Sequence, residues 1–447
     1  MKWGFLFTLH QTGQNAMISI EELYRIFLNC NSVSTDSRFI NKASLFFALK
    51  GEKFDGNSFA ETALRKGASF AIIDDANYAT NDKTLLVDNV LATLQELSLF
   101  HRKQLKIPVI AITGTNGKTT TKELVNTVLS QTYKTTATTG NLNNHIGVPL
   151  TLLSIRPETQ IAIIEMGANH VGEIDLLCRI ALPTHGIITN IGKAHLEGFG
   201  SFNGVIKAKT ELFNFLRLTY GVAFANKDNS LLMEHTKELR VITYGTDLSA
   251  AFNGIIIEDN DPYLKVQISF KSCSMNISSR LYGRYNFENI LAAACIGCHF
   301  NVGPDKIKAG IEQYIPSNNR SQVVNTGKNT LILDAYNSNP DSLKYAIQNF
   351  EASPYPEKTV IIGDMLELGK ESDEEHNNIL NLIEKSGFKD VFLVGPVFTR
   401  LNTKREWSCF QDSELARLWF DHHHLTGKTI LIKGSRGIML EKITDTL

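Results

Sequence analysis

The chain has 447 residues, of which 43% are hydrophobic and 20% are charged, and this composition excludes a wholly disordered protein. The 45 basic and 46 acidic residues nearly cancel, so no charge surplus points to a nucleic-acid partner. Six cysteines are too few for a disulfide scaffold. Because a compact domain usually contains about 100 to 200 residues, we expect roughly three domains.

The amino-terminal end has no clear targeting segment. The first ten residues are mildly apolar, but polar residues soon break the run, which is too short for a signal peptide. A cleaner amphipathic segment runs from Ile18 to Leu28, so residues 1–16 are interpreted as an extension or tail, and Met1 and Met17 both stay open as the true start. No run of about 18 apolar residues exists, so we expect a cytoplasmic protein without a membrane span.

Residues 17–105 are predicted to form an N-terminal α/β domain. Apolar runs at 45–49 and 69–73 predict buried strands, and the segment 59–66 between them predicts a helix. A further helical pattern over 91–106 leads into the next domain.

Residues 106–317 are predicted to form a central domain with a mostly parallel sheet. Short apolar runs at 109–112, 161–164 and 186–189 alternate with helical patterns, and this alternation is typical of parallel strands covered by helices. The stretch 251–281 alternates more strictly and carries few helix signals, which favours a small antiparallel insertion.

An Ala-rich helix is predicted over 287–300. Cys295 and Cys298 lie in it at C-x-x-C spacing, but no second pair is near. Small core residues are therefore favoured over metal or redox chemistry.

Residues 318–447 are predicted to form a Rossmann-like domain. Strand-like runs at 330–333, 359–362, 391–394 and 429–432 are separated by helical stretches. No fixed-period repeat or low-complexity segment interrupts them.

The strongest motif is Thr113-Gly114-Thr115-Asn116-Gly117-Lys118-Thr119-Thr120, which follows a predicted strand and opens a predicted helix. This arrangement points backbone N–H groups and a helix N-terminus at an anion. Lys118 would reach the outer phosphates of a nucleotide, and the Thr119 hydroxyl would hold Mg²⁺. Ile112 stands where the full G-x-x-x-x-G-K-[ST] pattern has its first glycine, but the strand and helix favour phosphate binding over an ordinary loop.

Two more polar residues follow predicted strands of the central domain. Glu165 comes directly after the run 161–164, where a carboxylate beside a phosphate loop can ligate Mg²⁺; a solvated strand end is the alternative. His195 also lies beyond a strand, although a lone histidine is more often structural.

Weaker patterns surround these residues. Lys207 and Lys209 lie two apart in a predicted helix over 201–216, so they point to different faces, and pattern alone indicates two solvated lysines. An amide cluster, which suits sugar or diphosphate recognition and equally suits turns, consists of Asn141, Asn143 and Asn144.

In the third region, charged residues again follow predicted strands. Asp334 follows the strand 330–333, where a carboxylate could take ribose hydroxyls. The run Lys433-Gly434-Ser435-Arg436-Gly437 follows another strand and is predicted to start a helix, which would suit an anionic group. Because the run lacks G-x-G-x-x-G spacing, a dinucleotide site has little support.

Taken together, these motifs resemble the Mur ligase family of peptidoglycan synthesis. The matching segments, in the family's order, are the loop 113–120, Glu165-Met166-Gly167, 190–195, 208–213, 286–289, Arg320, 334–340 and 433–436. The resemblance covers the chain from about Ile18 to its C-terminus. It implies an α/β fold of three domains: an N-terminal UDP-sugar-binding domain, a central ATP-binding domain and a C-terminal Rossmann-like domain.

Within the family, the chain is most similar to the branch that joins D-alanyl-D-alanine to UDP-N-acetylmuramoyl-tripeptide. The run 362–369, with His376 downstream, is similar to that branch, and the Asp-Asn-Pro-Arg motif of the diaminopimelate-adding relatives is absent. The segments 34–38 and 51–56 resemble the uridine-nucleotide domain that both branches share. Tyr285 departs from the histidine that relatives often carry there, which concerns adenine packing.

The resemblance also implies residue roles. It implies an ATP-dependent ligase that works through an acyl phosphate, with Lys118, Lys209 and His195 catalytic. Lys209 matches a lysine that becomes a carbamate and completes two Mg²⁺ sites with Thr119, Glu165 and His195. The implied ATP contacts are Gly114, Thr115, Asn116, Gly117, Lys118, Thr119, Thr120, Asn289, Arg320 and Asp334. The candidate substrate contacts are Ser34, Thr35, Asp36, Ser37, Arg38, Asn141, Asn143, Asn144, Tyr336, Asn337 and Asn339.

Three alternatives stay open. A relative in the family could add a different amino acid or peptide. A folylpolyglutamate synthetase shares the ATP core but has no reason to carry 34–38. A regulatory nucleotide-binding protein is disfavoured because Lys118, Glu165, His195 and Lys209 are all retained. We expect a monomer.

Overall fold

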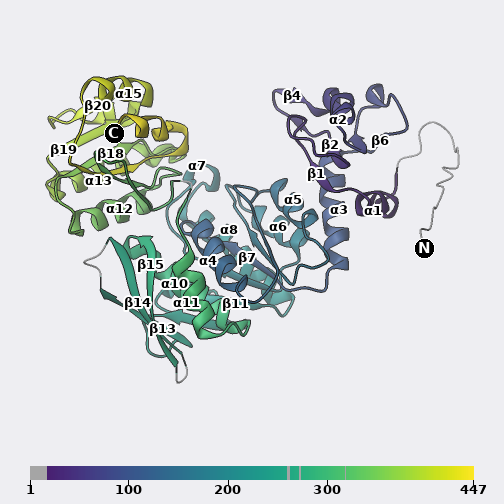
Figure 1. The fold of residues 1–447 in the computed structure, drawn as a ribbon, viewed down its shortest axis with the longest axis horizontal. Helices are drawn as coiled ribbons and strands as arrows, with labels where there is room; N and C mark the ends of the chain where they lie inside the picture. The colour runs from purple at the N-terminus through teal and green to yellow at the C-terminus, as the bar shows by residue number, and fades with distance from the viewer. Residues whose placement is uncertain (1–17, 259–261, 271–272, 318) are drawn as a thin grey trace. The chain divides into compact units, whose positions relative to one another are not determined.

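The computed structural model describes residues 18–258, 262–270, 273–317 and 319–447 (Figure 1). The proposed tail 1–16, the alternative start Met17 and the domain boundary at residue 318 lie outside the described residues. Contacts divide the chain into two compact units. The first unit holds the described residues up to Lys106 with Thr139–Arg156 and Arg179–Leu182, and the second holds Ile107–Thr138, Pro157–Cys178 and Pro183–Leu447.

The first unit is built on a four-stranded parallel sheet in the order β1-β2-β5-β6. Its strands are β1 (Ser32–Ser34), β2 (Ser44–Phe47), β5 (Phe70–Ile73) and β6 (Thr84–Leu86), with a separate hairpin of β3 (Lys50–Gly51) and β4 (Phe54–Asp55). Its helices are α1 (Ile20–Leu28), α2 (Ala60–Arg65), α3 (Val90–Gln104), α5 (Gly147–Leu153) and the short 3₁₀ turns η1 (Gly56–Phe59) and η2 (Ala76–Tyr78). The predicted strands and helices of this region are confirmed, with small shifts at their ends.

Alternating side chains of β2 explain why helices cover both faces of this sheet. Leu45 and Phe47 enter one core, which α1 and α3 complete, whereas Phe46 enters a second core with the residues of α2. At the start of α1, Ser19 and Glu22 form a reciprocal capping box, which stabilises the helix end.

The second unit contains a nine-stranded sheet in the order β15-β14-β13-β12-β11-β10-β7-β9-β8. Its strands are β7 (Val109–Thr113), β8 (Thr135–Ala137), β9 (Ile161–Glu165), β10 (His185–Ile188), β11 (Val222–Asn226), β12 (Arg240–Gly245), β13 (Phe252–Glu258), β14 (Tyr263–Phe270) and β15 (Cys273–Tyr282). The accompanying helices are α4 (Lys118–Leu129), α6 (Glu173–Ala181), α7 (Leu196–Phe199), α8 (Phe202–Leu218), α9 (Ser230–Glu234), η3 (Arg284–Asn286), α10 (Phe287–His299) and α11 (Pro304–Gln313). The strands from β8 to β13 pair in parallel, as predicted.

The prediction of a small antiparallel insertion over 251–281 is correct for the strand direction and wrong for its place. β13 pairs in parallel with β12, and only β14 and β15 add antiparallel strands, so the segment extends the central sheet. The reason is its buried face: Val266 and Ile268 share one core with Leu291 and Cys295 of α10. Cys295 is thus a core residue as predicted, and none of the six cysteines, all of which the structure describes, forms a disulfide.

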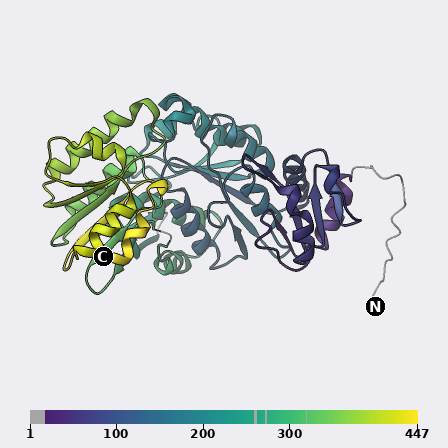
Figure 2. The ribbon, with the colours of Figure 1, turned by 90° about the horizontal axis from the view of Figure 1, so that it is seen from above.

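The rest of the second unit is a six-stranded sheet in the order β16-β17-β21-β18-β19-β20, parallel except for the edge strand β16. Its elements are β16 (Gln322–Asn325), β17 (Thr330–Leu333), α12 (Pro340–Ala352), β18 (Lys358–Gly363), η4 (Gly369–Glu371), α13 (Ser372–Ser386), β19 (Asp390–Val394), α14 (Pro396–Leu401), β20 (Ser408–Phe410), α15 (Ser413–His422), β21 (Thr429–Lys433), η5 (Arg436–Ile438) and η6 (Leu440–Thr446). Val360 and Ile362 of β18 face α12 and α13, while Ile361 faces α15 and η6. Figure 2 shows these helices on both sides of the sheet, which confirms the predicted Rossmann-like layering.

Among the described residues, no helix is both long enough and apolar enough to cross a membrane.

Candidate nucleotide and metal site

The order of the central strands brings three predicted loops to one edge of the sheet. β7 lies between β9 and β10, with Ile112 opposite Glu165 and Thr113 opposite Ile188. Because parallel strands end at the same edge, the residues that follow these strands lie beside one another. Two hydrogen bonds fix this edge: the Thr113 hydroxyl donates to the Met166 carbonyl (2.8 Å), and the Thr189 N–H donates to the Thr113 carbonyl (2.9 Å).

The predicted phosphate loop has the expected form. Lys118 begins α4 directly after Gly117, which has a left-handed φ of 78°. The Lys118 ammonium donates to the carbonyl oxygens of Gly114 (2.7 Å) and Thr115 (3.0 Å), so it lies over the loop that precedes it. From this position over the loop, a lysine can contact the outer phosphates of a bound nucleotide.

Asn190 and Thr189 hold the loop from the neighbouring strand end. The Asn116 N–H donates to the Asn190 side-chain oxygen (2.9 Å), and the Thr115 N–H donates to the Asn190 carbonyl (2.9 Å). The Thr189 hydroxyl donates to the Asn116 carbonyl (2.6 Å). These hydrogen bonds within the protein fix the loop, which lowers the entropic cost of binding.

We expect Gly117→Ala to weaken ADP binding about tenfold or more, as measured by calorimetry. A methyl group there would lie 2.6 Å from the Asn289 side-chain oxygen, and the left-handed backbone costs a non-glycine residue about 1–2 kcal/mol. Gly387→Ala is the matched control, because Gly387 has a similar φ of 68° with nothing within 4 Å of the added methyl. Equal ADP affinity in both variants would contradict a close fit of the loop against Asn289.

Lys118 and Lys209 are two lysines of the site whose positive charges are both disfavoured by their surroundings. Burial lowers the pKa of Lys118 to about 8, with Glu165 opposing the shift and Arg320 adding to it. Burial also lowers the pKa of Lys209 to about 7, and the nearby Lys118 charge contributes in the same direction. A substantial fraction of Lys209 is therefore a neutral amine at neutral pH.

The prediction that Lys207 and Lys209 are both solvated is wrong for Lys209. Lys207 is exposed, whereas the Lys209 residue keeps only 2% of its surface. A signal was present in the sequence: Lys209 lies four residues after Val205 and seven before Leu216, on the apolar stripe of α8.

Phe199 links Lys209 to His195. The Lys209 ammonium lies 5.5 Å from the centre of the Phe199 ring, and the His195 ring centre is 6.4 Å from that of Phe199. Over the described ranges, no hydrogen bond or ion pair to the Lys209 ammonium is found. The structure thus gathers the loop 113–120, Glu165, His195 and Lys209 at one site.

The candidate metal ligands fit Mg²⁺ only with one chemical change. Within the described part of the chain, no three or more His, Cys, Asp or Glu side chains are grouped to hold a metal ion. Glu165 and His195 supply one carboxylate and one imidazole, whereas Mg²⁺ prefers several anionic or neutral oxygens. A Lys209 cation would repel the ion; a carbamate on the Lys209 nitrogen would add two oxygens, and a neutral buried amine is the form that can react with CO₂.

The predicted ATP contacts outside the loop fall into two groups. Asn289 is buried and accepts a hydrogen bond from the Thr121 hydroxyl (3.0 Å), and its side chain also lies next to Gly117 of the phosphate loop. Arg320 stacks on Tyr336, with its guanidinium carbon 3.6 Å from the ring centre, and Asp334 pairs with Lys433 at 2.6 Å.

The predicted helix after Lys433 is wrong. The run leads into the three-residue 3₁₀ turn η5 and then into the 3₁₀ segment η6, and neither is an α-helix. A turn of three residues is too short to supply a helix dipole. Lys433 is buried, and its ammonium donates a hydrogen bond to the Asp334 carboxylate, because a buried ammonium needs a carboxylate partner. Arg436, which lies 5.4 Å from the Tyr336 ring centre, is the exposed cation of this run.

The candidate substrate residues lie in both units. In the first unit, Arg38 donates to both carboxylate oxygens of Asp36 (3.0 and 2.7 Å), and the Ser34 hydroxyl closes the turn onto the Asp36 carbonyl (3.1 Å). The Asn144 side chain accepts from the Gly147 N–H (2.9 Å) at the start of α5, as the turn alternative indicated. Thr35, Ser37, Asn141 and Asn143 belong to the same unit.

In the second unit, Asn339 caps α12 and donates to the Asn116 side-chain oxygen (2.8 Å). Tyr336 lies between Arg320 and Arg436, and the Asn337 carbonyl lies 3.4 Å from the Lys433 ammonium. Asn339 therefore connects the six-stranded part directly to the phosphate loop.

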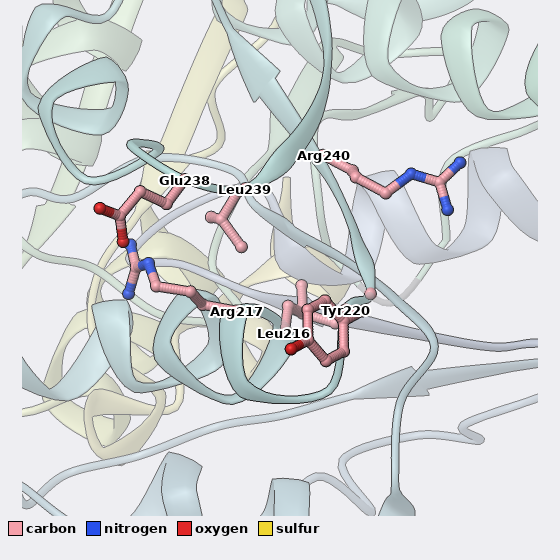
Figure 3. Close-up of a pocket in the computed structure, with 7 residues that line it drawn as sticks. Leu216, Arg217, Tyr220, Glu238, Leu239 and Arg240 are labelled. Atoms are coloured by element: carbon pink, nitrogen blue, oxygen red, sulfur yellow. The ribbon is translucent and has the colours of Figure 1, made fainter.

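A cavity of about 280 Å³ lies at the start of β11 and β12, at the opposite edge from the phosphate loop (Figure 3). It is lined by Leu216, Arg217, Tyr220, Gly221, Glu238, Leu239 and Arg240. The Arg217 guanidinium donates to the carbonyls of His235 (2.9 Å) and Lys237 (3.1 Å), and Arg240 points away from the cavity in Figure 3. None of the predicted site residues lines it, so it has no part in the candidate site.

The central sheet carries a strand, a glycine-containing loop with a lysine and a following helix, and Glu165 and His195 follow the two neighbouring strands. These features define a nucleotide-binding α/β protein of the phosphate-loop type. Comparison with known proteins narrows this class. Family models match 29–111 ("Mur ligase family, catalytic domain"), 112–297 ("Mur ligase middle domain") and 319–436 ("Mur ligase, glutamate ligase domain"). The chain belongs to the Mur ligase family, and its three-domain α/β fold is the one that the sequence resemblance predicted.

Individual relatives are similar over nearly their whole length. The UDP-N-acetylmuramoyl-tripeptide--D-alanyl-D-alanine ligase of Bacillus subtilis (strain 168) is 34% identical over 429 residues, which cover 93% of each chain. A crystal structure of MurF from Acinetobacter baumannii matches with a TM-score of 0.84 and 29% identity, over 96% of this chain and 98% of that one. The MurF ligase of Thermotoga maritima in complex with ADP has the same fold, with a TM-score of 0.83 and 24% identity over 94% and 97% of the two chains.

Proposed function

We propose that this chain is an ATP-dependent ligase that joins D-alanyl-D-alanine to UDP-N-acetylmuramoyl-tripeptide in the synthesis of peptidoglycan precursors. The observation that supports the substrates is similarity to relatives of that name over 93% of the chain. The run 362–369 with His376, which resembles that branch, supports the same assignment. The place of action would be the cytoplasm, where nucleotide-activated precursors and ATP are available.

The phosphate loop supports the first chemical step. The terminal carboxylate of the tripeptide attacks the γ-phosphorus of ATP, the bond to the bridging oxygen breaks, and ADP leaves an acyl phosphate behind. Lys118, poised over the loop, and Arg320, which contributes to the electrostatics of Lys118, would neutralise charge on the transferring group.

In the second step the amine of D-alanyl-D-alanine attacks the acyl carbon. The tetrahedral intermediate expels inorganic phosphate and loses a proton, which leaves a new peptide bond. Charge on the departing phosphate would again lie beside Lys118, so one lysine serves both steps.

Mg²⁺ bound to Thr119, Glu165, His195 and a carbamate on Lys209 would supply charge compensation for the phosphate oxygens. The depressed pKa of Lys209, about 7, supports the carbamate, because only a neutral amine adds to CO₂. This reaction forms a C–N bond and releases one proton from the nitrogen. The apolar stripe of α8 that buries Lys209 would keep the product away from water.

Phosphate release with defined substrates tests the proposal. Purified protein is incubated with ATP, Mg²⁺ and UDP-N-acetylmuramoyl-tripeptide, with and without D-alanyl-D-alanine. Released phosphate is measured, and the mass of the product is determined by mass spectrometry. We expect phosphate release that requires the dipeptide and a product heavier by that unit. The control pair is UDP-N-acetylmuramoyl-dipeptide with free diaminopimelate or lysine.

Phosphate release only with the control pair would mean that the protein catalyses the preceding ligation, and it would refute the proposed substrates. ATP binding without phosphate release in either pair would favour the regulatory alternative. Tripeptides that end in diaminopimelate or lysine, compared side by side, identify the third residue.

A further inference from the structure

The loop between β18 and η4 holds Glu367 in an unusual backbone conformation. Glu367 has a φ of 64°, in the left-handed region that non-glycine residues rarely adopt. Its carboxylate is about half exposed, with 55% of the side-chain surface accessible. Such strain persists only where surrounding contacts impose it, so these contacts indicate what the loop is built to present.

His376 and Ser435 fix the two residues that precede Glu367. The Met365 N–H donates to His376 Nε2 (3.0 Å), and the Leu366 N–H donates to the Ser435 hydroxyl (2.9 Å). His376 is fully buried, and its Nδ1 donates to the Ser372 carbonyl (2.7 Å). His376 is thus a neutral ring that spans the loop and the first turn of α13.

The fixed loop directs the Glu367 side chain at His195. Glu367 Oε2 contacts His195 Nδ1, and the Glu197 N–H lies 3.4 Å from the Glu367 carbonyl. The His195 Nδ1 atom is buried and makes no other contact with a polar partner within the described ranges. A carboxylate accepts hydrogen bonds, so a neutral His195 ring must carry its proton on Nδ1 and its lone pair on Nε2.

The same loop of the central part is held a second time, near Lys193. The Lys193 ammonium pairs with Glu375 at the start of α13 (2.7 Å), and the Lys193 N–H donates to Asp341 of α12 (2.9 Å). Gly192 leaves room for this contact, because a methyl group there would lie 2.4 Å from the Asp341 carboxylate. Residues of the six-stranded part therefore hold the His195 loop at both ends.

From these contacts we propose that Glu367 is a positioning residue, which fixes the His195 ring with Nδ1 protonated and leaves Nε2 available to the magnesium site. This rests on the proposed function only in taking His195 as a metal ligand. Carboxylates that hold a ligating histidine in this way typically change metal affinity by about 10–100-fold. The run 362–369, which the sequence resemblance singled out, thereby gains a physical role.

The test uses Glu367→Ala in the full chain, with two readouts that need no turnover. Nitrogen NMR of ¹⁵N-histidine protein without metal reports which ring nitrogen carries the proton, and a His195→Gln variant assigns the signal. Electron paramagnetic resonance then measures the affinity for Mn²⁺, used as the probe ion, in the presence of ADP. The control is Glu374→Ala, which removes an exposed carboxylate from α13 without touching His195.

In the wild-type protein we expect the His195 proton on Nδ1, and in Glu367→Ala a shift toward Nε2 with Mn²⁺ affinity reduced about tenfold. Glu374→Ala should behave as wild type. An unchanged tautomer in Glu367→Ala would overturn the proposal, and so would an equal loss of Mn²⁺ affinity in both variants, which would reduce the effect to overall charge. Because neither readout depends on ligation, failure of the proposed substrates would be seen separately as absent phosphate release.

Discussion

Lys118→Ala is expected to lower ATP-dependent phosphate release by about a thousandfold while leaving the protein folded. The Lys118 ammonium is the cation that the phosphate loop holds over its own carbonyls, at 2.7 and 3.0 Å. Removing it would take away the cation that the proposed mechanism places beside the transferring phosphoryl group in the first step and beside the departing phosphate in the second. The measurement is single-turnover phosphate release with saturating ATP and both substrates.

Stability separates this loss from unfolding. Lys118 is partly buried and its pKa is lowered to about 8, so the folded state gains little from its charge, and the midpoint of thermal unfolding should change little in Lys118→Ala. Lys134→Ala, which removes an exposed lysine of the same unit, should keep full activity. Turnover near the wild-type rate in a folded Lys118→Ala protein would mean that the phosphate-loop assignment is wrong.

Lys209→Met is expected to lower phosphate release at least about a hundredfold without loss of stability. The Lys209 residue is 2% exposed on the apolar stripe of α8, and methionine has a similar length without the ammonium. Since burying an ammonium costs free energy, the variant should unfold at the same or a higher temperature. Opposite changes in activity and stability are difficult to explain unless Lys209 is kept for chemistry.

Carbon NMR of protein equilibrated with ¹³CO₂ identifies that chemistry. A carbamate signal should be present in the wild-type protein, absent in Lys209→Met and unchanged in the exposed control Lys207→Met. The pKa of Lys209 is about 7, so the neutral amine that binds CO₂ predominates above this pH and is lost below it. The signal should therefore fall as the pH drops from 8 to 6; its absence at pH 8 would contradict the carbamate.

Much of the candidate site could be predicted because its parts are local. Gly117 before Lys118, a strand before the loop and a helix after it are features of adjacent residues, and the structure contains each of them. Glu165 could be assigned to the same edge because parallel strands end together, and the pairing of Ile112 with Glu165 agrees.

Other parts could not be predicted because they depend on partners distant in sequence. Asn289 contacts the helix that follows the phosphate loop through a hydrogen bond with Thr121, which lies 168 positions away in the chain. The sequence around Lys433 predicts an anion-binding residue, yet Lys433 forms an ion pair with Asp334, which follows another strand of the same sheet. No local pattern contains such pairs.

Local sequence patterns were enough to predict most of the strands and helices, the phosphate loop and the resemblance to the family, because spacing, turn residues and hydrophobic period act over a few positions. Three features depend on packing between distant segments: the burial of Lys209, the extension of the central sheet by β13 to β15, and the contact of Glu367 with His195. Burial, pKa and the partners of a side chain depend on which elements pack together. That packing minimises exposed apolar surface over the whole chain, and it is set by no single segment.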